Sequence, residues 1–406
     1  MDETTIIDVL KRWNPWVMEI SAGIERPEYL QKISPYLERK EIIVLKGVRR
    51  SGKSTIMKQL INRLIKDGAD RKQILYLNLD DYNFANDLRL RLLEDVLNAY
   101  RSYSKSRKKI YFFIDEAQKI DGWEKWIRTK YDQDENIKFV VSGSSASLLS
   151  KELSTLLTGR NLSFKIMPLS FREFLEFRKD GTLEEYLKFG GFPEVVLERS
   201  EDKKLFILGQ YFEDIIHKDI VDRYDIRNAK QLVELARYLV SVAGSKISFN
   251  KLSKVFGLSK DTLALYVSYM IDAYLLFEVP YFSYSAKIKH DVTKLPKMYV
   301  LDNGLINAVS IRYSRNLGQM FENSVLIRLF EQFDDVSYWA ELKSEVDFIV
   351  DGRAINVTAT DDIAEREARG LEDFLNRNKN FSSLLITRSI TKGNKVSLPV
   401  FLKMKL

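Results

Sequence analysis

Residues 41–55 read EIIVLKGVRRSGKST, and this stretch decides the fold of the chain. The apolar run at 42–45 predicts a buried strand that ends at Gly47. From Gly47 to Ser54 the residues have the spacing G-x-x-x-x-G-K-[ST], in which glycines let backbone N–H groups surround phosphate oxygens at the positive end of a helix. A chance glycine turn is the alternative, but a strand pattern before it and a helical pattern after it favour a nucleotide-phosphate site.

Two side chains of this loop have expected roles of their own. Lys53 would reach the β- and γ-phosphates, and the hydroxyl of Ser54 would ligate Mg²⁺. The residues expected to contact ATP are Gly47, Val48, Arg49, Arg50, Ser51, Gly52, Lys53, Ser54 and Thr55.

Bulk composition restricts the classes of protein to which this chain can belong. It has 406 residues, enough for two or three domains with cores of their own. No apolar run reaches the roughly 18 residues that a membrane span needs, and the start, MDETTIIDVLKRW, lacks a signal-peptide pattern. We therefore expect a cytoplasmic protein with no membrane partner. There are no cysteines and only two histidines, which excludes disulfides and argues against structural zinc. The net charge of +7 permits nucleic-acid contact without demonstrating it.

Two carboxylates follow a second buried strand. The segment KKIYFFIDEAQKI (108–120) contains an apolar strand, and Asp115 and Glu116 stand at its carboxyl end. In a nucleotide-binding α/β sheet, the ligand lies at that edge. We expect Asp115 to hold Mg²⁺ together with Ser54, and Glu116 to orient and activate the attacking water. Another strand, ILYLNLDD (74–81), also ends in carboxylates.

Two further candidates for this site each leave an alternative open. The strand IKFVVSGSS (137–145) ends in small polar residues, and Ser144, or alternatively Ser142, could sense the γ-phosphate or the attacking water. The same serines could instead cap the next helix. Arg160, at the end of LLTGR, could act on the phosphate of a neighbouring subunit or could form a surface salt bridge.

Six motifs occur in an order that resembles one known group of proteins. They are GVRRSGKST (47–55), FFIDEAQKI (112–120), VSGSSASLL (141–149), LLTGR (156–160), PLSFREF (168–174) and FGGFPEV (189–195). Together they resemble the AAA+ superfamily ATPases of archaea and bacteria that carry an uncharacterised nuclease-like C-terminal domain. The resemblance implies an ASCE P-loop core with a parallel sheet of order 5-1-4-3-2. It also implies a homo-oligomer, with a ring possible, and ATP hydrolysis coupled to work.

The segments on either side of this core have helical patterns. Residues 1–40 are expected to form packing helices, although the segment 24–26 could instead cover the adenine. Apolar residues recur at helical steps from 196 to about 244. Residues 248–280 then predict a helix-turn-helix and the start of a wing, with Gly257 in the turn and Ser259 as the cap of the second helix. The side chains expected to enter a nucleic-acid groove are Lys260, Thr262 and Tyr266. Alternatively, this winged helix docks a protein.

The C-terminal part alternates strand and helix patterns and resembles a PD-(D/E)XK nuclease domain. The sequence predicts a helix around FENSVLIRLFEQF and strands at KMYVLD, VSYWAEL, EVDFIVDG, AINVT, LLITR and LPVFL. Such a site needs carboxylates for metal ions and a lysine on the third strand. Glu322 and Asp347 match the family's two acids, but Asn356 and Thr358 stand where the third acid and the lysine belong. We therefore expect a degenerate binding fold. Asp302 could line the same pocket or cap a turn.

The sequence as a whole predicts an α/β protein of three domains. These are an AAA+ P-loop ATPase domain with an N-terminal helical segment (1–195), a helical connector with a winged helix (196–285), and a degenerate nuclease-like domain (286–406). The expected function is Mg²⁺-dependent ATP hydrolysis that drives conformational work on nucleic acid. Two other functions stay open: an ATP-gated nuclease, and a nucleotide-controlled switch that docks a protein.

Overall fold

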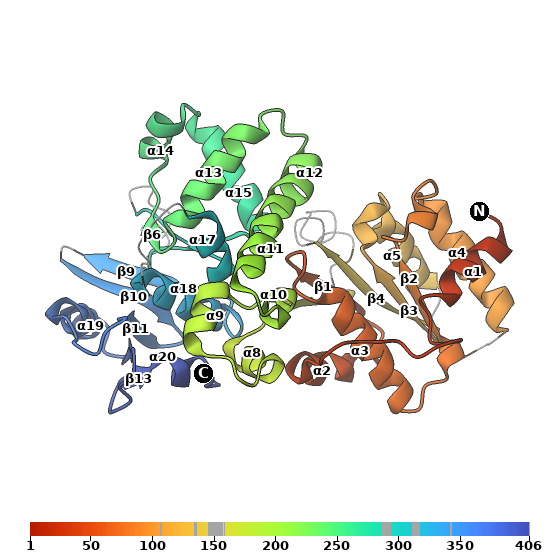
Figure 1. Ribbon diagram of the computed structural model, residues 1–406, viewed down its shortest axis with the longest axis horizontal. Helices are drawn as coiled ribbons and strands as arrows, with labels where there is room; N and C mark the ends of the chain where they lie inside the picture. Colours follow the sequence, from red (N-terminus) through yellow and green to blue (C-terminus); the bar gives the residue numbers. More distant parts are fainter. Residues whose placement is uncertain are drawn as a thin grey trace. The chain divides into compact units, whose positions relative to one another are not determined.

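The computed structural model describes residues 1–105, 108–133, 136–144, 157, 159–285, 294–310, 317–341 and 343–405. The chain divides into two compact units, Met1–Ile166 and Met167–Leu406 (Figure 1). The finer division into three domains stays a prediction. Among the helices of the described residues, none is both long and apolar enough to cross a bilayer.

A five-stranded sheet forms the centre of the first unit. Its strands are β1 (Ile42–Gly47), β2 (Ile74–Asn78), β3 (Ile110–Asp115), β4 (Ile137–Ser144) and β5 (Asn161–Lys165). All neighbours pair in parallel, and the order is β2-β3-β4-β1-β5. Read from the opposite edge, this is the order 5-1-4-3-2, so that prediction is confirmed.

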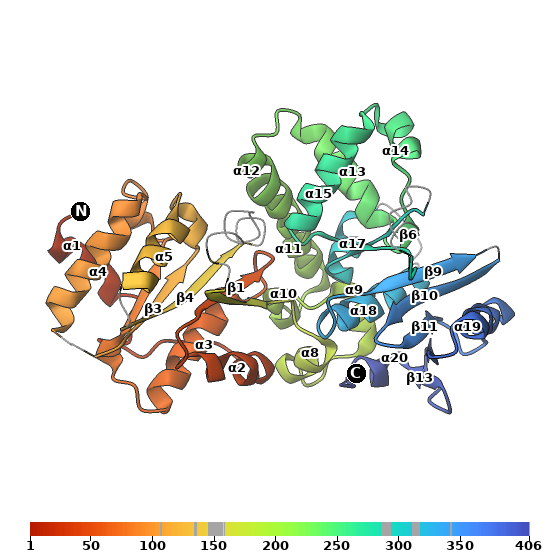
Figure 2. The ribbon, with the colours of Figure 1, turned by 180° about the vertical axis from the view of Figure 1, so that it is seen from behind.

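Helices cover both faces of this sheet, as expected for buried parallel strands. One face packs against α1 (Glu3–Lys11), α4 (Leu90–Ser104) and α5 (Trp123–Gln133), and the other against α2 (Pro27–Ile33) and α3 (Lys53–Lys66) (Figures 1 and 2). Successive strand residues serve opposite faces: Val44 belongs to the first core and Leu45 to the second. Short 3-10 turns are η1 (Ser34–Tyr36), η2 (Arg71–Gln73), η3 (Tyr82–Phe84) and η4 (Ala117–Lys119).

Residues 12–26 are not helical, so the helical pattern predicted through 1–40 is correct only for α1, α2 and η1. Asn14 explains the break, because its side-chain amide donates to the carbonyls of Leu10 and Tyr76 (2.8 Å each) and accepts from the Tyr76 N–H (2.6 Å). Trp16 Nε1 likewise donates to the Ile74 carbonyl (2.6 Å). These side chains pair with backbone groups of β2, which is an edge strand.

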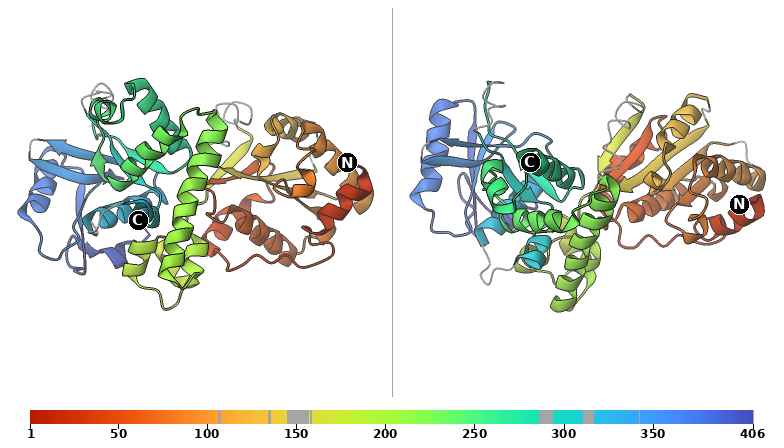
Figure 3. Two further views of the ribbon diagram at one scale, coloured as in Figure 1. Left: turned by 45° about the horizontal axis from the view of Figure 1, so that its top comes forward. Right: turned by 90° about the horizontal axis from the view of Figure 1, so that it is seen from above.

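The second unit begins with helices and ends in a mixed sheet. Its N-terminal helices are α8 (Phe171–Phe177), α9 (Leu183–Phe189), α10 (Pro193–Leu197), α11 (Glu201–Asp214), the π-helix η5 (Ile215–Val221), α12 (Asp222–Tyr224), α13 (Ala229–Ser241), α14 (Phe249–Phe256) and α15 (Lys260–Asp272). The helices α11, η5 and α12 follow one another without a break (Figure 3). The helical pattern predicted from 196 to 244 is thus confirmed.

Two sheets complete this unit. The small antiparallel sheet has the order β6-β8-β7, with β6 (Ser245–Lys246), β7 (Leu276–Val279) and β8 (Lys297–Val300). The mixed sheet has the order β13-β12-β11-β10-β9, with β9 (Ser337–Glu341), β10 (Ser344–Val350), β11 (Arg353–Val357), β12 (Ser382–Thr387) and β13 (Lys395–Ser397). The remaining helices described in the second unit are α17 (Asn303–Val309), α18 (Leu317–Phe330), α19 (Glu365–Arg377) and α20 (Leu398–Phe401). Of these, α19 lies against β10 and β11 (Figure 2).

Local capping chemistry decides two predictions in this unit. The helix-turn-helix elements are present: Gly257 ends α14 with φ 63°, and the side chain of Ser259 caps α15 by accepting from the Thr262 N–H (3.1 Å). The prediction of a strand in LPVFL is wrong. That segment forms α20, because Pro399 in its first turn fits a helix start.

A buried carboxylate explains the motif FGGFPEV. Asp302 accepts from the N–H of Gly191 (2.7 Å) and from that of Gly304 (2.8 Å), so it caps α17 and fastens the loop after α9. Gly190 has φ +71°, and a Cβ there would lie 1.6 Å from Asp302 Oδ1. Of the two roles predicted for Asp302, the cap is confirmed.

Candidate functional site

The loop between β1 and α3 has two positions whose backbone geometry requires glycine. Gly52 has φ +97° and is the N-cap of α3, which begins at Lys53. A Cβ on Gly47 would lie 2.1 Å from the carbonyl oxygen of Ile166, so the strand end accepts only glycine. The turn therefore leads directly into the positive end of α3, where the N–H groups of a helix start favour anions.

Lys53 is buried and points back into this loop. Its Nζ donates to the carbonyls of Gly47 and Val48 at 3.0 Å each. The residue is only 5% exposed. The carbonyls of the loop thus hold this ammonium beside the start of α3.

Asp115 is held rigidly at the end of β3. It is 2% exposed, its Oδ2 accepts from the Tyr76 hydroxyl (2.7 Å), and its Oδ1 accepts from the Ser142 hydroxyl. Burial, and then the charge of Asp115, raise the pKa of Tyr76 well above its ordinary value. Tyr76 therefore keeps its proton and donates a hydrogen bond to the carboxylate.

Glu116 follows in a left-handed conformation, with φ 58°. Its N–H donates to Ser142 Oγ (3.2 Å), and its carboxylate accepts from Gln118 Nε2 (2.5 Å). A non-glycine residue in this conformation is unusual and occurs often at functional sites. The carboxylate of Glu116 is therefore positioned from both its backbone and its side chain.

The sheet brings the loop and the acids to one edge. β4 pairs with β1 on one side, with Gly47 opposite Ser144, and with β3 on the other, with Ile114 opposite Val141. Because parallel neighbours lie about 4.8 Å apart, two strand spacings of together about 10 Å separate Asp115 from the level of Leu45, and β1 continues two residues further to Gly47.

The weaker candidates of this site have different outcomes. Ser142, the alternative to Ser144, makes the contacts to Asp115 and Glu116 described above. The backbone of Ser144 ends β4, but its side chain lies outside the described part of the structure. Arg160 forms an ion pair with Asp132 (3.1 Å), which is the surface salt bridge that the sequence left open. Its action on a second subunit stays a prediction.

Arg26 belongs to the segment 24–26, which the sequence analysis left open as a cover for the adenine. It is 2% exposed and stacks over the ring of Tyr29, with 4.5 Å from the guanidinium carbon to the ring centroid. Its Nη1 donates to the carbonyl of Ser51 in the phosphate loop (2.9 Å). Gln59 of α3 holds the same segment through the carbonyls at 22 and 24 (3.0 and 2.7 Å). The only signal in the sequence was the position of 24–26 next to an expected nucleotide.

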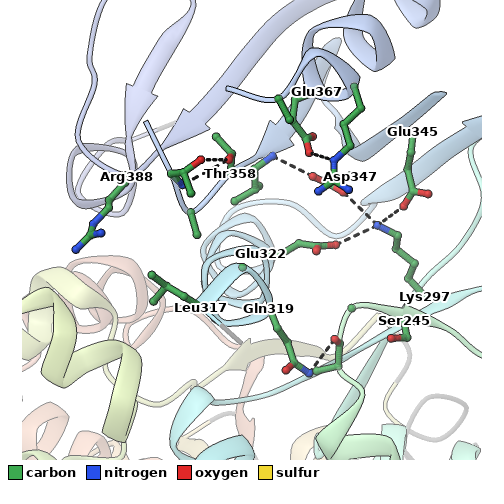
Figure 4. Close-up of a pocket in the computed structure, with 18 of the residues that line it drawn as sticks. Ser245, Lys297, Leu317, Gln319, Glu322, Glu345, Asp347, Thr358, Glu367 and Arg388 are labelled. Carbon is green, nitrogen blue, oxygen red and sulfur yellow. Dashed lines mark hydrogen bonds and ion pairs between the residues drawn. The ribbon is translucent and has the colours of Figure 1, made fainter. Parts of the chain in front are cut away.

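A second polar site lies in the second unit, in a cavity of about 900 Å³ (Figure 4). Glu322 of α18, Asp347 of β10 and Thr358 after β11 line it, as the sequence predicted for the nuclease-like pocket. Glu345 and Lys297 line it as well. A helix, two neighbouring strands and β8 of the small sheet thus converge on one cavity.

Lys297 is the centre of this cavity, and sequence reasoning missed it. Its Nζ lies 3.0 Å from Glu322, 2.7 Å from Glu345 and 3.2 Å from Asp347. Burial opposes the charge, but the Tyr299 hydroxyl and the three carboxylates raise the pKa of Lys297 well above its ordinary value. Burial, and then Asp347, raise the pKa of Glu322 to about 7. The only signal in the sequence was that Lys297 is the one charged residue of the segment KMYVL (297–301).

Asn356, expected in this pocket, is not among the residues that line the cavity. Its side chain accepts from the Asp347 N–H (3.0 Å) and donates to the carbonyl of Glu367 (3.0 Å), and the residue is 1% exposed. It therefore binds backbone groups of α19 and β10 and also donates to the Glu367 carboxylate (3.3 Å), which does line the cavity. Within the described residues, no group of three or more acidic or histidine side chains is arranged to hold a metal ion.

The nucleic-acid candidates lie on the first half of α15. Lys260 is exposed, whereas Thr262 and Tyr266 are half-buried. The hydroxyl of Thr262 lies 2.8 Å from Ser259 Oγ, so part of its hydrogen-bonding capacity serves the helix cap. Contact of these residues with nucleic acid stays a prediction.

Two family models match successive parts of the chain. Residues 39–175 match the family model described as AAA domain, and residues 180–317 match one described as a domain of unknown function. The uncharacterized protein MJ1544 of Methanocaldococcus jannaschii is 35% identical over 336 residues, which are 77% of this chain and 72% of that protein. An uncharacterized protein of Haemophilus influenzae is 31% identical over 389 residues, which are 90% of this chain and 94% of that protein.

Solved structures give a weaker likeness. A point mutant of Thermotoga maritima RuvB has a TM-score of 0.34 and 17% identity, over 63% of this chain and 90% of that chain. The Aeropyrum pernix ORC1 protein, solved in complex with DNA, has a TM-score of 0.30 and 13% identity, over 76% of this chain and 96% of that chain. TM-scores of this size do not establish a common overall fold.

Proposed function

Because this chain belongs to the family of MJ1544 and its Haemophilus relative and carries an AAA domain, we propose that it binds and hydrolyses ATP. One observation carries the proposal: the buried ammonium of Lys53 and the carboxylates of Asp115 and Glu116 belong to the same carboxyl edge of a parallel sheet. A cation for phosphate and an acid for water are the two parts that phosphoryl transfer to water needs.

The residues act by position and charge. Backbone N–H groups from Gly47 to Gly52 bind the phosphates, and Lys53 leaves its carbonyl partners to neutralise them. Glu116, held by Ser142 and Gln118, orients the attacking water and accepts its proton. Ser54 and Asp115 offer the oxygen donors that Mg²⁺ prefers, and the ion would add positive charge to the phosphates when bound.

Two substitutions test this site. We expect Glu116→Gln to retain bound ATP with turnover reduced by at least about a hundredfold, and Lys53→Ala to lose binding or hydrolysis. Asp67→Asn is the matched control. Asp67 lies at the far end of α3, away from the loop, and its carboxylate forms an ion pair with Arg63. Hydrolysis rates and retained nucleotide are measured together, and normal turnover in either site variant refutes the assignment.

We propose further that hydrolysis drives work on nucleic acid in a homo-oligomer, in which Arg160 of one copy completes the site of another. The net charge of +7 and the helix-turn-helix elements support the nucleic-acid part. The test is the ATPase rate with single-stranded DNA, duplex DNA or RNA, alongside the mass of the assembly in ATP. An unchanged rate with all three polymers would favour the protein-docking switch instead.

A metal-dependent nuclease gated by ATP is a second candidate, and one observation favours it. Lys297 supplies the cation that Thr358 lacks, next to Glu322 and Asp347. The ammonium also stands among the carboxylates that a metal would need, which favours a binding fold without cleavage. Cutting of DNA or RNA in Mg²⁺ or Mn²⁺ that Asp347→Ala abolishes would support the nuclease.

A further inference from the structure

A smaller cavity of about 360 Å³ lies at the outer edge of the mixed sheet, away from the acidic cavity. The chain segment after β7 lies beside β9: Tyr338 N–H donates to the Pro280 carbonyl (2.9 Å), and Phe282 N–H donates to the Tyr338 carbonyl (2.6 Å). This backbone pairing fixes the position of the aromatic residues that follow Pro280. They line the cavity together with Trp339 of β9 and Arg377 of α19.

Rigid aromatic packing forms the floor of this cavity. The ring of Phe282 meets those of Phe374 and Phe381 edge-on, with centroids 5.6 and 5.7 Å apart. Trp339 packs against Phe374 in the same way (5.5 Å) and is 4% exposed. Because these rings support one another, the floor is formed before any ligand arrives.

One aromatic ring stands out from this floor into solvent. Tyr284 is 76% exposed, and its ring meets that of Phe282 in a T-shaped contact, with centroids 5.1 Å apart and planes at 75°. A large exposed ring in a cavity wall is a stacking surface for a flat ligand.

Two cations accompany the rings. Lys294 Nζ lies 4.3 Å from the ring centroid of Tyr281, and the guanidinium carbon of Arg377 lies 5.6 Å from the ring centroid of Trp339. Arg377 is paired with Glu341, whose charge it balances, so Lys294 leaves the cavity net positive. An exposed ring beside a lysine suits a ligand that is flat and aromatic in one part and anionic in the next.

We propose that this cavity binds single-stranded nucleic acid, with a base stacked on Tyr284 and an adjoining phosphate at Lys294. The inference deepens the proposed action on nucleic acid and rests on it. Stacking on an aromatic side chain combined with a backbone cation is the general mode of single-strand binding. A duplex would not bind in this way, because its bases are already stacked on one another. The site is separate from Lys260, Thr262 and Tyr266 of α15.

The test measures binding of labelled oligo(dT) and oligo(U) to the full chain by fluorescence anisotropy, without ATP. Tyr284→Ala should weaken binding about tenfold, because stacking is typically worth one factor of ten or more per base. Tyr284→Phe keeps the ring and should bind within about twofold of the original chain. A plot of the logarithm of the binding constant against the logarithm of the salt concentration has a negative slope. Lys294→Ala should make this slope about 0.7 less steep, the value for one phosphate contact of a single strand.

Matched controls separate this site from general effects. Tyr82 of η3 is 80% exposed in the first unit, so Tyr82→Ala removes an equally exposed ring and should leave binding unchanged. Thermal unfolding of Tyr284→Ala should match that of the original chain, because the ring is exposed. The measurements are repeated with Lys53→Ala, in which the oligonucleotide affinity should persist even though hydrolysis is lost.

Four results would overturn the proposal. They are the absence of oligonucleotide binding, equal affinity of Tyr284→Ala and the original chain, the same loss with Tyr82→Ala, or duplex binding that only Lys260→Ala weakens. Failure of ATP hydrolysis with intact Tyr284-dependent binding would refute the proposed function alone.

Discussion

Replacing Lys297 by methionine should destabilise the acidic cavity in a way that depends on pH. The side chain keeps its length but loses the ammonium that contacts Glu322, Glu345 and Asp347. Removing one partner from a buried ion pair typically costs about 3–5 kcal/mol, because the remaining charge is left unpaired.

The remaining contacts place the expected cost at the lower end of that range. Glu322 keeps the Tyr299 hydroxyl (2.6 Å), Glu345 keeps Lys246 (2.8 Å), and Asp347 keeps the Val357 N–H (2.9 Å). We therefore expect a loss of about 3 kcal/mol. Lys246→Met is the matched control: its side chain is 36% exposed and makes one ion pair in the same cluster, so it should cost no more than about 1 kcal/mol.

The pH dependence follows from Glu322. Its pKa in the folded chain is about 7, whereas a carboxyl group of an unfolded chain titrates near its ordinary value, so between these values the folded state binds more protons. The contribution of Glu322 to stability is therefore largest when it is protonated and decreases as the pH rises toward 7. Without the ammonium, ionised Glu322 is still less favourable. The gap between Lys297→Met and the original chain should thus be larger at pH 8 than at pH 5.

The assay must report on this cavity alone, because a chain of two compact units need not unfold in one step. Native-state hydrogen exchange of peptides from β10 measures the local free energy of opening in the full chain, and peptides from β3 are the internal control. Equal destabilisation by Lys297→Met and Lys246→Met would refute the reasoning, as would a gap that does not change with pH.

Three other substitutions follow from single contacts. Gln118→Ala should lower the turnover number for ATP about tenfold with the Michaelis constant within twofold, because Glu116 loses the amide that positions it; equal changes in both constants would contradict this. Gly190→Ala should cost about 3 kcal/mol or more in chemical denaturation, because the new Cβ would overlap Asp302 at a left-handed φ; Gly209→Ala, in open space within α11, should instead be neutral or stabilising. Burial raises the pKa of Asp302 to about 6, so the folded chain binds the proton more tightly than the unfolded chain does. The stability of the original chain relative to Asp302→Asn should therefore decrease as the pH rises from about 4 to about 6. A stability difference that stays constant over that range would refute this prediction.

The loop after β1 and the acids after β3 could be predicted because their signals are local in the sequence. The spacing from Gly47 to Ser54 and the position of Asp115 after an apolar strand each specify a backbone geometry within a few residues. Lys297 was not predictable in this way, because its partners come from a helix and a strand that lie 25 and 50 residues away in the chain. A pattern in one strand carries no record of which distant acids it will meet.

Side-chain hydrogen bonds to the backbone account for other differences. Asn14 stops the expected N-terminal helix because pairing with the edge strand β2 satisfies its amide better than a helix interior would. The side chain of Asn356 does not line the pocket for the same reason, because its amide forms hydrogen bonds with backbone groups of β10 and α19. Both residues have short amide side chains, whose partners depend on what the fold brings within reach.

Pairing within the second unit also constrains how that unit can be divided. β7 and β8 lie on either side of residue 285 and pair as antiparallel neighbours, from Leu276 opposite Val300 to Val279 opposite Lys297. The side chain of Lys297 then continues from this small sheet to carboxylates of α18 and β10. A domain boundary at 285 would place β7 and β8 in different domains. Lys297 would stay in one domain with its acids, but its strand β8 would lose its partner β7. We therefore expect the small sheet and the acidic cavity to unfold together, because Lys297 of β8 contacts acids of both α18 and β10.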